Sequence, residues 1–337
     1  MTVLITGGAG YIGSHVALCL LDHDEEAIVL DDLSTGCKHL VPPRARFVRG
    51  DIADRELVTR TIQDHCIRAV IHLAARTIVP DSVAHPAEYY RINVAKTQTL
   101  LETVASAGVP HVIFSSSAAV YGNPAASPVP ETAALQPISP YGRSKLMVEW
   151  MLEDMTRSDE MTAVALRYFN VAGADPLGRS GQVSAAGNQI VKTAVQAACG
   201  MRDGIDLYGD DYSTPDGTCI RDYVHVSDVA AAHLAVLRYM RRGGGGAVFN
   251  IGSGHGTSVW GIIEAVKRLS GCNFPVRIGP RRPGDPAAVV ADTAAMRMML
   301  RWRPAYDSLN EIVGDALSWE RRLTDSHFGE MERVSAN

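Results

Sequence analysis

The chain has 337 residues, of which 46% are hydrophobic and 20% are charged, and it carries a formal net charge of −5 with an isoelectric point near 6.1. A chain of this size can bury a large core in one or two domains, and its charge offers no attraction for nucleic acid or an anionic membrane. Because no signal-peptide pattern follows Met1 and no apolar stretch is long enough to span a bilayer, we expect a cytoplasmic protein without a membrane segment.

The six cysteines are scattered without the short paired spacings of a zinc site or a disulfide framework. They lie at positions 19, 37, 66, 199, 219 and 272. We therefore predict reduced thiols and no metal site.

The first unit of the chain is a short apolar strand at residues 3–6, followed by a glycine-rich loop and an apolar helix. The loop contains Gly7, Gly10 and Gly13, which permit a tight turn, the close approach of a pyrophosphate and close packing of helix on sheet. The amides at the start of the helix are donors for such an anion. The unit predicts a dinucleotide site.

A second apolar strand, at residues 27–30, ends in Asp31 and Asp32. An acidic residue at this distance from the glycine loop is typical of a contact with the adenosine ribose. A carboxylate there repels the 2′-phosphate of NADP, so the pattern favours NAD.

Strand and helix patterns alternate through the first half of the chain. Near-continuous apolar strands between amphipathic helices predict an α/β fold of Rossmann type, a doubly wound parallel sheet covered on both faces. Ligands bind such sheets beyond the carboxyl ends of the strands, where Gly7, Asp31, Asp51, Ala74 and Ser117 fall. Further strands are expected at residues 46–48, 69–75, 111–117 and 162–168, and helices near 54–65, 93–107 and 141–157.

Tyr141 and Lys145 are four residues apart, a spacing that places both side chains on one face of a helix. A cation about 5 Å away favours the phenolate by roughly 3 kcal/mol, or about two pK units, at an effective dielectric constant of about 20. The pair therefore predicts a tyrosine that acts as a base.

The second half, from about Asn170, contains glycine- and proline-rich connections between shorter helices, near 187–199, 227–240, 258–270 and 308–322. Long loops in a compact protein often form binding sites, so we expect a smaller C-terminal lobe that binds substrate. We assign residues 1–170 to an NAD-binding domain and 171–325 mainly to the substrate lobe, with room for some chain to return to the first domain. Residues 326–337 are polar and are expected to form a frayed tail.

Five segments together resemble one known family, the UDP-glucose 4-epimerases of the extended short-chain dehydrogenase/reductase superfamily. They are Thr6 to Ser14, Phe114 to Gly122, Tyr141 to Lys145, Arg167 to Asn170 and Asp216 to Val226. The similarity runs from residue 2 to about 320, and the last segment is much more specific than the glycine loop. The resemblance implies an isomerase that keeps NAD bound, takes a hydride from C4 of a UDP-hexose, and returns it to the other face of the 4-keto sugar.

The resemblance also implies roles for single residues. Tyr141 is the base for the 4-hydroxyl proton, Lys145 lowers its pKa and holds the nicotinamide ribose, and Ser117 hydrogen-bonds the same sugar oxygen. The implied cofactor contacts are Tyr11 and Ile12 at the pyrophosphate, Asp31 at the ribose, Asp51 and Ile52 at the adenine, and Leu73, Ala74, Ala75, Asn93 and Tyr168 along the dinucleotide.

For the nucleotide sugar, the resemblance implies contacts from five residues. They are Asn170, Tyr208 under the uracil, Arg221 and Arg282 on the diphosphate, and Asp285 on the uridine ribose. Two guanidinium groups suit a diphosphate because each can bind it bidentately.

Two departures and one variable position leave the identity of the sugar open. Gln189 stands where the family more often has Asn or His, and Val289 stands where some members have a Tyr against the sugar. Arg76 occupies a sugar-facing position that varies within the family. These residues do not alter the expected fold or reaction.

Other functions are weighed against the same residues. Related dehydratases need an acidic pair directly after the catalytic Ser or Thr, and decarboxylating relatives need a glutamate at the second of these positions; here both are alanines, Ala118 and Ala119. C4 epimerisation of UDP-xylose, UDP-arabinose or UDP-N-acetylglucosamine stays open, as does a non-catalytic NAD-binding role. The family resemblance further implies a homodimer that pairs the helices near 93–107 and 141–157.

Overall fold

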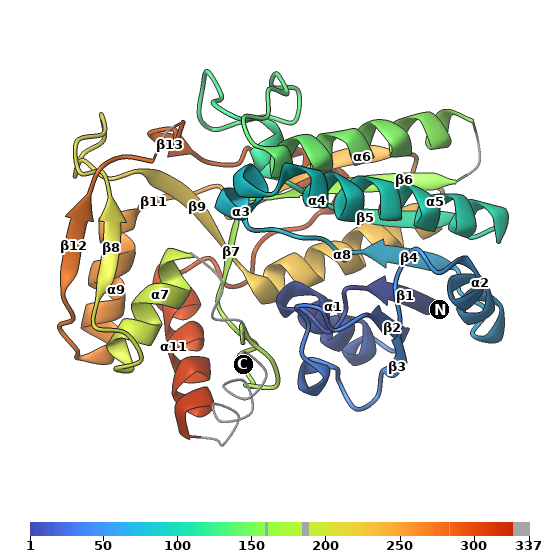
Figure 1. Cartoon of the computed structure of the whole chain (residues 1–337), viewed down its shortest axis with the longest axis horizontal. Coiled ribbons are helices and arrows are strands. Elements are labelled where there is room, and N and C mark those ends of the chain that lie inside the picture. Colours follow the sequence, from blue (N-terminus) through green and yellow to red (C-terminus); the bar gives the residue numbers. More distant parts are fainter. Residues whose placement is uncertain (159–160, 184–188, 283, 326–337) are drawn as a thin grey trace.

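The computed structural model describes residues 1–158, 161–183, 189–282 and 284–325. The chain forms a large lobe around a seven-stranded sheet and a smaller lobe at one end of it (Figure 1). Within the described ranges, no helix is long and apolar enough to cross a membrane.

The large sheet is parallel throughout, with the strand order β10-β6-β5-β4-β1-β2-β3. Its strands are β1 (Thr2–Thr6), β2 (Glu26–Asp31), β3 (Arg46–Arg49), β4 (Ala69–His72), β5 (His111–Ser117), β6 (Thr162–Tyr168) and β10 (Ala247–Ile251). The order reverses direction on either side of β1, because the chain first builds β2 and β3 outward and then returns to β4. This arrangement confirms the predicted doubly wound α/β fold.

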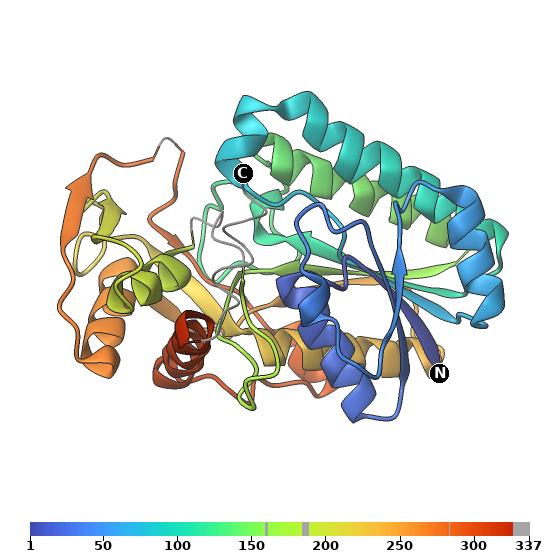
Figure 2. The ribbon, with the colours of Figure 1, turned by 60° about the horizontal axis from the view of Figure 1, so that its bottom comes forward.

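Helices cover both faces of this sheet (Figures 1 and 2). On one face, α1 (Tyr11–Asp22), α8 (Val226–Arg241) and α10 (Ala294–Leu300) enclose a core that includes Val3, Ile5, Val29, Ile71 and Phe249. On the other face, α2 (Arg55–Asp64), α5 (Thr97–Ser106) and α6 (Pro140–Arg157) enclose a second core that includes Leu4, Leu30, Val70, Val112 and Leu100. Alternate residues of each strand thus enter opposite cores, which explains why these strands are apolar along their whole length.

The segment between β4 and α5 is more helical than its sequence pattern predicts. Helices α3 (Val79–Ala84) and α4 (Pro86–Tyr90) precede a π-helical turn, η2 (Arg91–Lys96), that leads directly into α5. The expected helix near 93–107 therefore begins earlier and contains a π-helical turn. Such turns are rare and often mark functional sites.

Among the described residues, the small lobe contains two small sheets and three helices. Strands β7 (Asn170–Ala172), β11 (Gly256–Ser258) and β13 (Ala288–Val289) all pair with β9 (Ile220–His225), and β8 (Ile205–Tyr208) pairs with β12 (Val276–Gly279). Helices α7 (Ile190–Ala198), α9 (Val259–Ser270) and α11 (Leu309–Asp325) pack on these strands around a third apolar core. Strand β9 runs from the small lobe toward α8, so it joins the two lobes (Figure 1).

The second half of the chain returns to the large lobe after this crossing. Helix α8 packs on α1, and β10 adds the edge strand beside β6. Short 3-10 turns complete the described fold at η1 (Lys38–Leu40) and η3 (Ala118–Val120). The predicted frayed tail at 326–337 and the first two residues of the helix expected near 187–199 lie outside the described residues.

Candidate active site

The glycine loop lies between β1 and α1 and is packed too closely for side chains. Gly7 has a φ of +71°, and a Cβ there would lie 2.6 Å from the backbone nitrogen of Ala74. A Cβ on Gly13 would lie 2.3 Å from the carbonyl oxygen of Gly7. The glycines therefore allow the loop to turn, to touch the end of β4 and to pack the first turn of α1 against the sheet.

The start of α1 is open to an anion. Its N-cap residue is Gly10, which has no side chain to cap the helix, and the first turn contains no acidic residue. The amides of Tyr11, Ile12 and Gly13 lie in this first turn, where a helix lacks internal acceptors. These donors and the helix dipole suit a pyrophosphate.

Asp31 lies at the end of β2 and is 8% exposed. Its carboxylate accepts hydrogen bonds from the backbone of Ala9 (3.0 Å) and of Leu33 (2.9 Å), and burial raises its pKa. Each carboxylate oxygen has one further acceptor position, which fits the hydroxyls of a ribose. Asp32 is exposed and accepts a bond from the backbone of Ser34 (2.8 Å).

Asp51 and Ile52, expected at the adenine, lie directly after β3. Ile52 is buried in the core beneath α2, and Asp51 forms an ion pair with Lys96. Burial opposes ionisation of Asp51, but the bonds from Lys96 and from the backbone of Ala53 outweigh it and lower the pKa. The glycine loop, the open helix start and Asp31 thus fit NAD, while an adenine contact of Asp51 stays a prediction.

Leu73, Ala74 and Ala75 follow β4, which ends at His72 and is therefore shorter than the strand expected at 69–75; all three are partly exposed. The buried side-chain amide of Asn93 forms two hydrogen bonds with the backbone of Arg76. The amide oxygen accepts from the Arg76 nitrogen, and the amide nitrogen donates to the Arg76 carbonyl, both at 2.9 Å. The same nitrogen also donates to Ser144 Oγ at 3.1 Å. The amide of Asn93 therefore holds the segment after β4 against α6. A contact between Asn93 and the cofactor stays a prediction.

Ser117, Tyr141 and Lys145 meet where β5 ends and α6 begins. Ser117 is the last residue of β5, and Ser139 caps α6 by accepting from the backbone of Gly142 (3.1 Å). The Lys145 ammonium donates to the Ser115 carbonyl (2.7 Å) and lies 5.8 Å from the centre of the Tyr141 ring. The predicted pairing of tyrosine and lysine on one helix face is therefore present.

The electrostatics of this pair differ from the prediction made for it. Burial raises the pKa of Tyr141, and a hydrogen bond with Ser117 opposes that shift. Burial also lowers the pKa of Lys145 to about 7, with Glu149 acting in the opposite direction. In the protein chain alone, desolvation thus outweighs the expected effect of Lys145 on the phenol.

Tyr168 lies at the end of β6, beside Ser117 in the sheet register. Its hydroxyl is hydrogen-bonded with Nε2 of His233 on α8, at 2.6 Å, and its ring belongs to the core under α1. This partner was not foreseen, because it depends on the packing of α8 on the sheet. A contact between Tyr168 and the cofactor stays a prediction. Because the hydroxyl is already bonded to His233, such a contact can be made by the rest of the residue.

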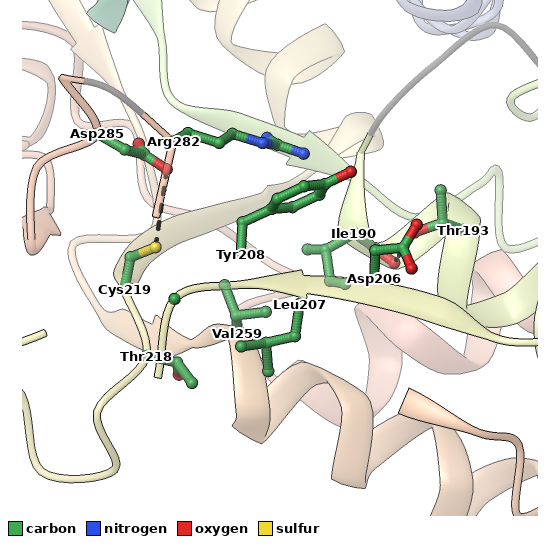
Figure 3. Close-up of a pocket in the computed structure, with 11 residues that line it drawn as sticks. Ile190, Thr193, Asp206, Leu207, Tyr208, Thr218, Cys219, Val259, Arg282 and Asp285 are labelled. Atoms are coloured by element: carbon green, nitrogen blue, oxygen red, sulfur yellow. Dashed lines mark hydrogen bonds between the residues drawn. The ribbon is translucent and has the colours of Figure 1, made fainter. Parts of the chain in front are cut away.

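A pocket in the small lobe contains three of the residues expected to bind the nucleotide, Tyr208, Arg282 and Asp285 (Figure 3). The Arg282 guanidinium lies 4.1 Å from the centre of the Tyr208 ring, and the ring is 36% exposed. An aromatic ring and a cation side by side can bind a base and a phosphate group.

Arg221 and Asp285 form an ion pair, and both side chains are partly buried. Arg221 lies on β9 beside Val289, its partner on β13. Val289 is 9% exposed and packs in an apolar cluster with Phe169 and Val120. The structure thus brings Arg221 and Val289, the residue expected to limit the size of the sugar, onto neighbouring strands.

Three other expected substrate residues lie apart from this pocket. Asn170 is exposed at the start of β7, and Gln189 is exposed at the N-cap of α7, where it borders a small hollow with Lys192 and Trp319. The guanidinium of Arg76 is paired with Glu88 (2.9 Å). Substrate contacts of these three residues stay predictions.

The structure also reveals residues that the sequence reasoning missed. Cys219 and Thr218, with Ile190 and Thr193, line the pocket that contains Tyr208, Arg282 and Asp285 (Figure 3). The segment Asp216 to Val226 already indicated a site, but only the pairing of β9 with its neighbours shows which of its side chains face the pocket.

The parallel sheet, the glycine loop after β1, and a tyrosine and a lysine beside the end of β5 define an enzyme of the short-chain dehydrogenase/reductase type. A family model, described as the NAD dependent epimerase/dehydratase family, matches residues 3–252. The chain belongs to this family.

Individual relatives agree with this assignment. A UDP-glucose 4-epimerase of Azospirillum brasilense is 48% identical over 324 residues, which cover 96% of this chain and 93% of that protein. A solved UDP-glucose-4-epimerase from Stenotrophomonas maltophila, with bound NAD and formylated UDP-arabinopyranose, has a TM-score of 0.93 at 36% identity, covering 96% of this chain and 99% of that one. The UDP-Glc/GlcNAc 4-epimerase of Campylobacter jejuni has a TM-score of 0.83 at 43% identity, covering 95% and 99%. The resemblance to UDP-glucose 4-epimerases is confirmed.

Proposed function

We propose that the protein interconverts UDP-glucose and UDP-galactose by inverting C4 of the hexose with tightly held NAD. The observation that carries this proposal is the meeting of Ser117, Tyr141 and Lys145 beside a glycine loop fitted to a dinucleotide. Two of the relatives reported above are named UDP-glucose 4-epimerases, and the solved structure of one of them holds NAD.

In this reaction, Tyr141, Ser117 and Lys145 have different roles. NAD, when bound, supplies the acceptor for the C4 hydride and then its donor. Tyr141 takes the proton of the 4-hydroxyl and returns it, while Ser117 hydrogen-bonds the same oxygen as charge develops on it. Lys145, held by the Ser115 carbonyl, supplies the positive charge that favours the phenolate once protonated.

The residues after Ser117 favour epimerisation over elimination. Ala118 and Ala119 form the start of the turn η3, so no acid or base follows Ser117 there to remove water or carbon dioxide from the sugar. The 4-keto sugar would therefore be reduced again at C4 without losing a group from the sugar. A non-catalytic NAD-binding role is the weaker alternative, because such a role needs no Tyr141 or Lys145.

For the sugar, we propose glucose and galactose as the preferred pair. The relatives' names include glucose and N-acetylglucosamine, and one solved structure holds a formylated UDP-arabinopyranose. Val289 is smaller than tyrosine, so it leaves room for substituents at C2, but it is larger than alanine or serine. We therefore expect weaker activity on the N-acetylated sugars.

The test is a coupled assay on UDP-galactose, UDP-xylose and UDP-N-acetylgalactosamine, with protein purified without added cofactor. We expect UDP-galactose to be the best substrate. Nucleotide extracted from the denatured protein should be NAD, because a reaction that returns its hydride does not require the cofactor to leave. Extracted NADP, or turnover that depends wholly on added NADH, would contradict the proposal.

We further propose a homodimer formed through α5 and α6. The outer face of α6 exposes Met147 and Trp150, which are 37% and 54% exposed, and Val83 of the neighbouring helix α3 is 63% exposed. Large apolar side chains grouped on one face suit a two-fold interface. Light scattering should give twice the chain mass at micromolar concentration, and Trp150→Glu should give the monomer; a wild-type monomer would reject the dimer.

Two further expectations accompany this function. We propose that residues 1–170 mainly bind the cofactor and residues 171–325 mainly bind the UDP-sugar. We also propose a cytoplasmic location, where the six free thiols stay reduced. Fractionation of cells that express the full chain tests the location.

A further inference from the structure

A buried ion pair lies directly beneath the catalytic residues. Arg167 on β6 and Glu149 on α6 are only 4% and 6% exposed, and they bond bidentately: Nε to Oε1 at 3.0 Å and Nη2 to Oε2 at 2.6 Å. Taking two charges out of water is costly, so a pair of this kind is weak evidence for stability. The position of this ion pair next to the catalytic residues suggests a role in catalysis.

The Glu149 carboxylate also accepts a hydrogen bond from the side chain of Ser116 on β5. Because side chains alternate along a strand, Ser116 faces α6 from within β5, and Ser117 ends the strand, where its side chain is hydrogen-bonded with Tyr141. In the sheet, Ser116 is paired with Arg167, and Ser117 is paired with Tyr168. One carboxylate therefore ties α6, which carries Tyr141, to the two strand ends that carry Ser117 and Tyr168.

Glu149 also stands in line with the catalytic pair on its own helix. Tyr141, Lys145 and Glu149 are spaced four residues apart, on one buried face of α6. Lys145 is bonded to the carbonyl of Ser115, the residue before Ser116. The end of β5 is thus fastened to α6 by two consecutive residues, one through Lys145 and one through Glu149.

Titratable groups near Lys145 come from α6, β4 and β6. Tyr141 and Glu149 lie on α6 with it, and His72 lies on β4. From β6, Tyr168 lies near Tyr141, and Arg167 is bonded to Glu149. Burial lowers the pKa of His72 to about 3, so its ring is neutral at physiological pH. Glu149 is the only anion in this group, and it stands between two cations, Lys145 and Arg167.

We propose that Glu149 is a positioning residue for the C4 epimerisation: clamped by Arg167 and Ser116, it fixes the register of Tyr141 and Lys145 against Ser117 and places its negative charge one helical turn from Lys145. This inference rests on the function proposed above. It goes beyond the Ser, Tyr and Lys roles because Glu149 touches none of the reacting atoms and acts through its neighbours.

The test compares two variants that each neutralise a buried glutamate. Glu149→Gln keeps the shape of the side chain and removes its charge. Its matched control is Glu320→Gln on α11, whose partner Lys192 is equally buried (2.6 Å; 3% and 1% exposed) but lies in the small lobe, outside the catalytic contacts. Both changes break a buried pair, so both should lower the unfolding temperature.

Only Glu149→Gln should alter the chemistry. We expect its kcat to fall by about 10- to 100-fold, because small misplacements of reacting groups have effects of this size, with KM and the extracted NAD content within about twofold of wild type. The alkaline limb of its kcat against pH should move down by about one pH unit, since Lys145 loses the anion that favours its charged form. Glu320→Gln should change neither kcat nor the position of the alkaline limb.

Other outcomes also decide the question. If wild type epimerises and Glu149→Gln has the kcat and pH profile of Glu320→Gln, Glu149 is merely structural and the inference is wrong. If wild type itself does not epimerise any UDP-sugar, the proposed function fails first. Should Glu149→Gln not fold, Ser116→Ala removes one bond and keeps the ion pair; it should lower kcat by about 3- to 10-fold without changing KM, and an unchanged kcat would reject the inference.

Discussion

The two lobes hold their functional side chains in different ways. In the large lobe, the side chains next to the chemistry are buried and bonded at several points: Lys145 to a strand carbonyl, and Glu149 to both Arg167 and Ser116. In the small lobe, Tyr208 is 36% exposed, and its contact with Arg282 is one ring face against one guanidinium.

This difference matches what each lobe has to do. Groups that move a proton or guide a hydride need fixed positions, because geometry sets the rate. Groups that bind a nucleotide can adjust their side chains as the ligand enters, at a modest entropic cost. Changes in the large lobe should therefore lower kcat, whereas changes in the small lobe should raise KM.

The largest expected effect is that of Tyr141→Phe. Removing the base should lower kcat by at least ~10²-fold, the usual loss for a general base, while UDP affinity changes little because the phenol lies outside the nucleotide pocket. Steady-state kinetics and a UDP-binding titration measure the two quantities. Near-normal turnover would reject Tyr141 as the base, and an equal loss of UDP affinity would make it a binding residue.

The opposite behaviour is expected for Arg282→Ala. Loss of charge-assisted hydrogen bonds, worth about 1.5 to 3 kcal/mol, should raise KM about 10- to 100-fold and leave kcat within about threefold. Arg281→Ala is the matched control, because Arg281 belongs to the same loop but bonds to Asp211 and stacks on Tyr212. A drop in kcat for Arg282→Ala, with KM unchanged, would contradict the division between the lobes.

The parts of the site that the sequence predicts are those that depend on local spacing. Gly7, Gly10, Gly13 and Asp31 form one continuous unit, and Tyr141 and Lys145 lie four apart on one helix. Helix periodicity and strand order are enough to place them. The seven-stranded sheet could be foreseen for the same reason, apart from its edge strand β10.

The parts that the sequence does not predict depend on contacts between distant segments. Glu149 meets Ser116 across 33 positions of the chain, and Tyr168 meets His233 across 65. No local pattern encodes such pairs, because they form only when strands and helices from different units pack together. Burial has the same origin, which is why the predicted lowering of the Tyr141 pKa is not seen in the chain alone.

A smaller effect is expected from Val289→Tyr, which tests whether the small lobe also sets sugar choice. A single clash usually costs about 1 to 3 kcal/mol, so the ratio of kcat/KM for UDP-galactose to that for UDP-N-acetylgalactosamine should rise by ~10- to 100-fold. Val289 packs beside Phe169 and Val120, so Val289→Leu is the control for simple crowding of this cluster. An unchanged ratio in the tyrosine variant would show that Val289 does not line the sugar pocket.

The smallest effect compares one buried hydroxyl from each lobe. In the large lobe, the Tyr121 hydroxyl donates to Asn250 (2.6 Å) and accepts from Arg167 (2.9 Å). In the small lobe, the Tyr212 hydroxyl is buried without a hydrogen-bond partner among the described residues, and the neighbouring thiol of Cys219 is only a weak hydrogen-bonding group. Tyr121→Phe leaves two polar groups with fewer partners, whereas Tyr212→Phe removes a group that is poorly satisfied already.

We therefore expect Tyr121→Phe to lower the free energy of unfolding by about 1 to 2 kcal/mol and Tyr212→Phe to change it by less than about 0.5 kcal/mol. Thermal and urea unfolding of both variants measure the difference. The two values also compare the lobes. A rigid hydrogen-bond network loses stability when one hydroxyl is removed, whereas a region whose side chains can adjust does not. Equal losses in the two variants would mean that the small lobe is held as firmly as the large one, and that its looser contacts do not reflect a division between catalysis and binding.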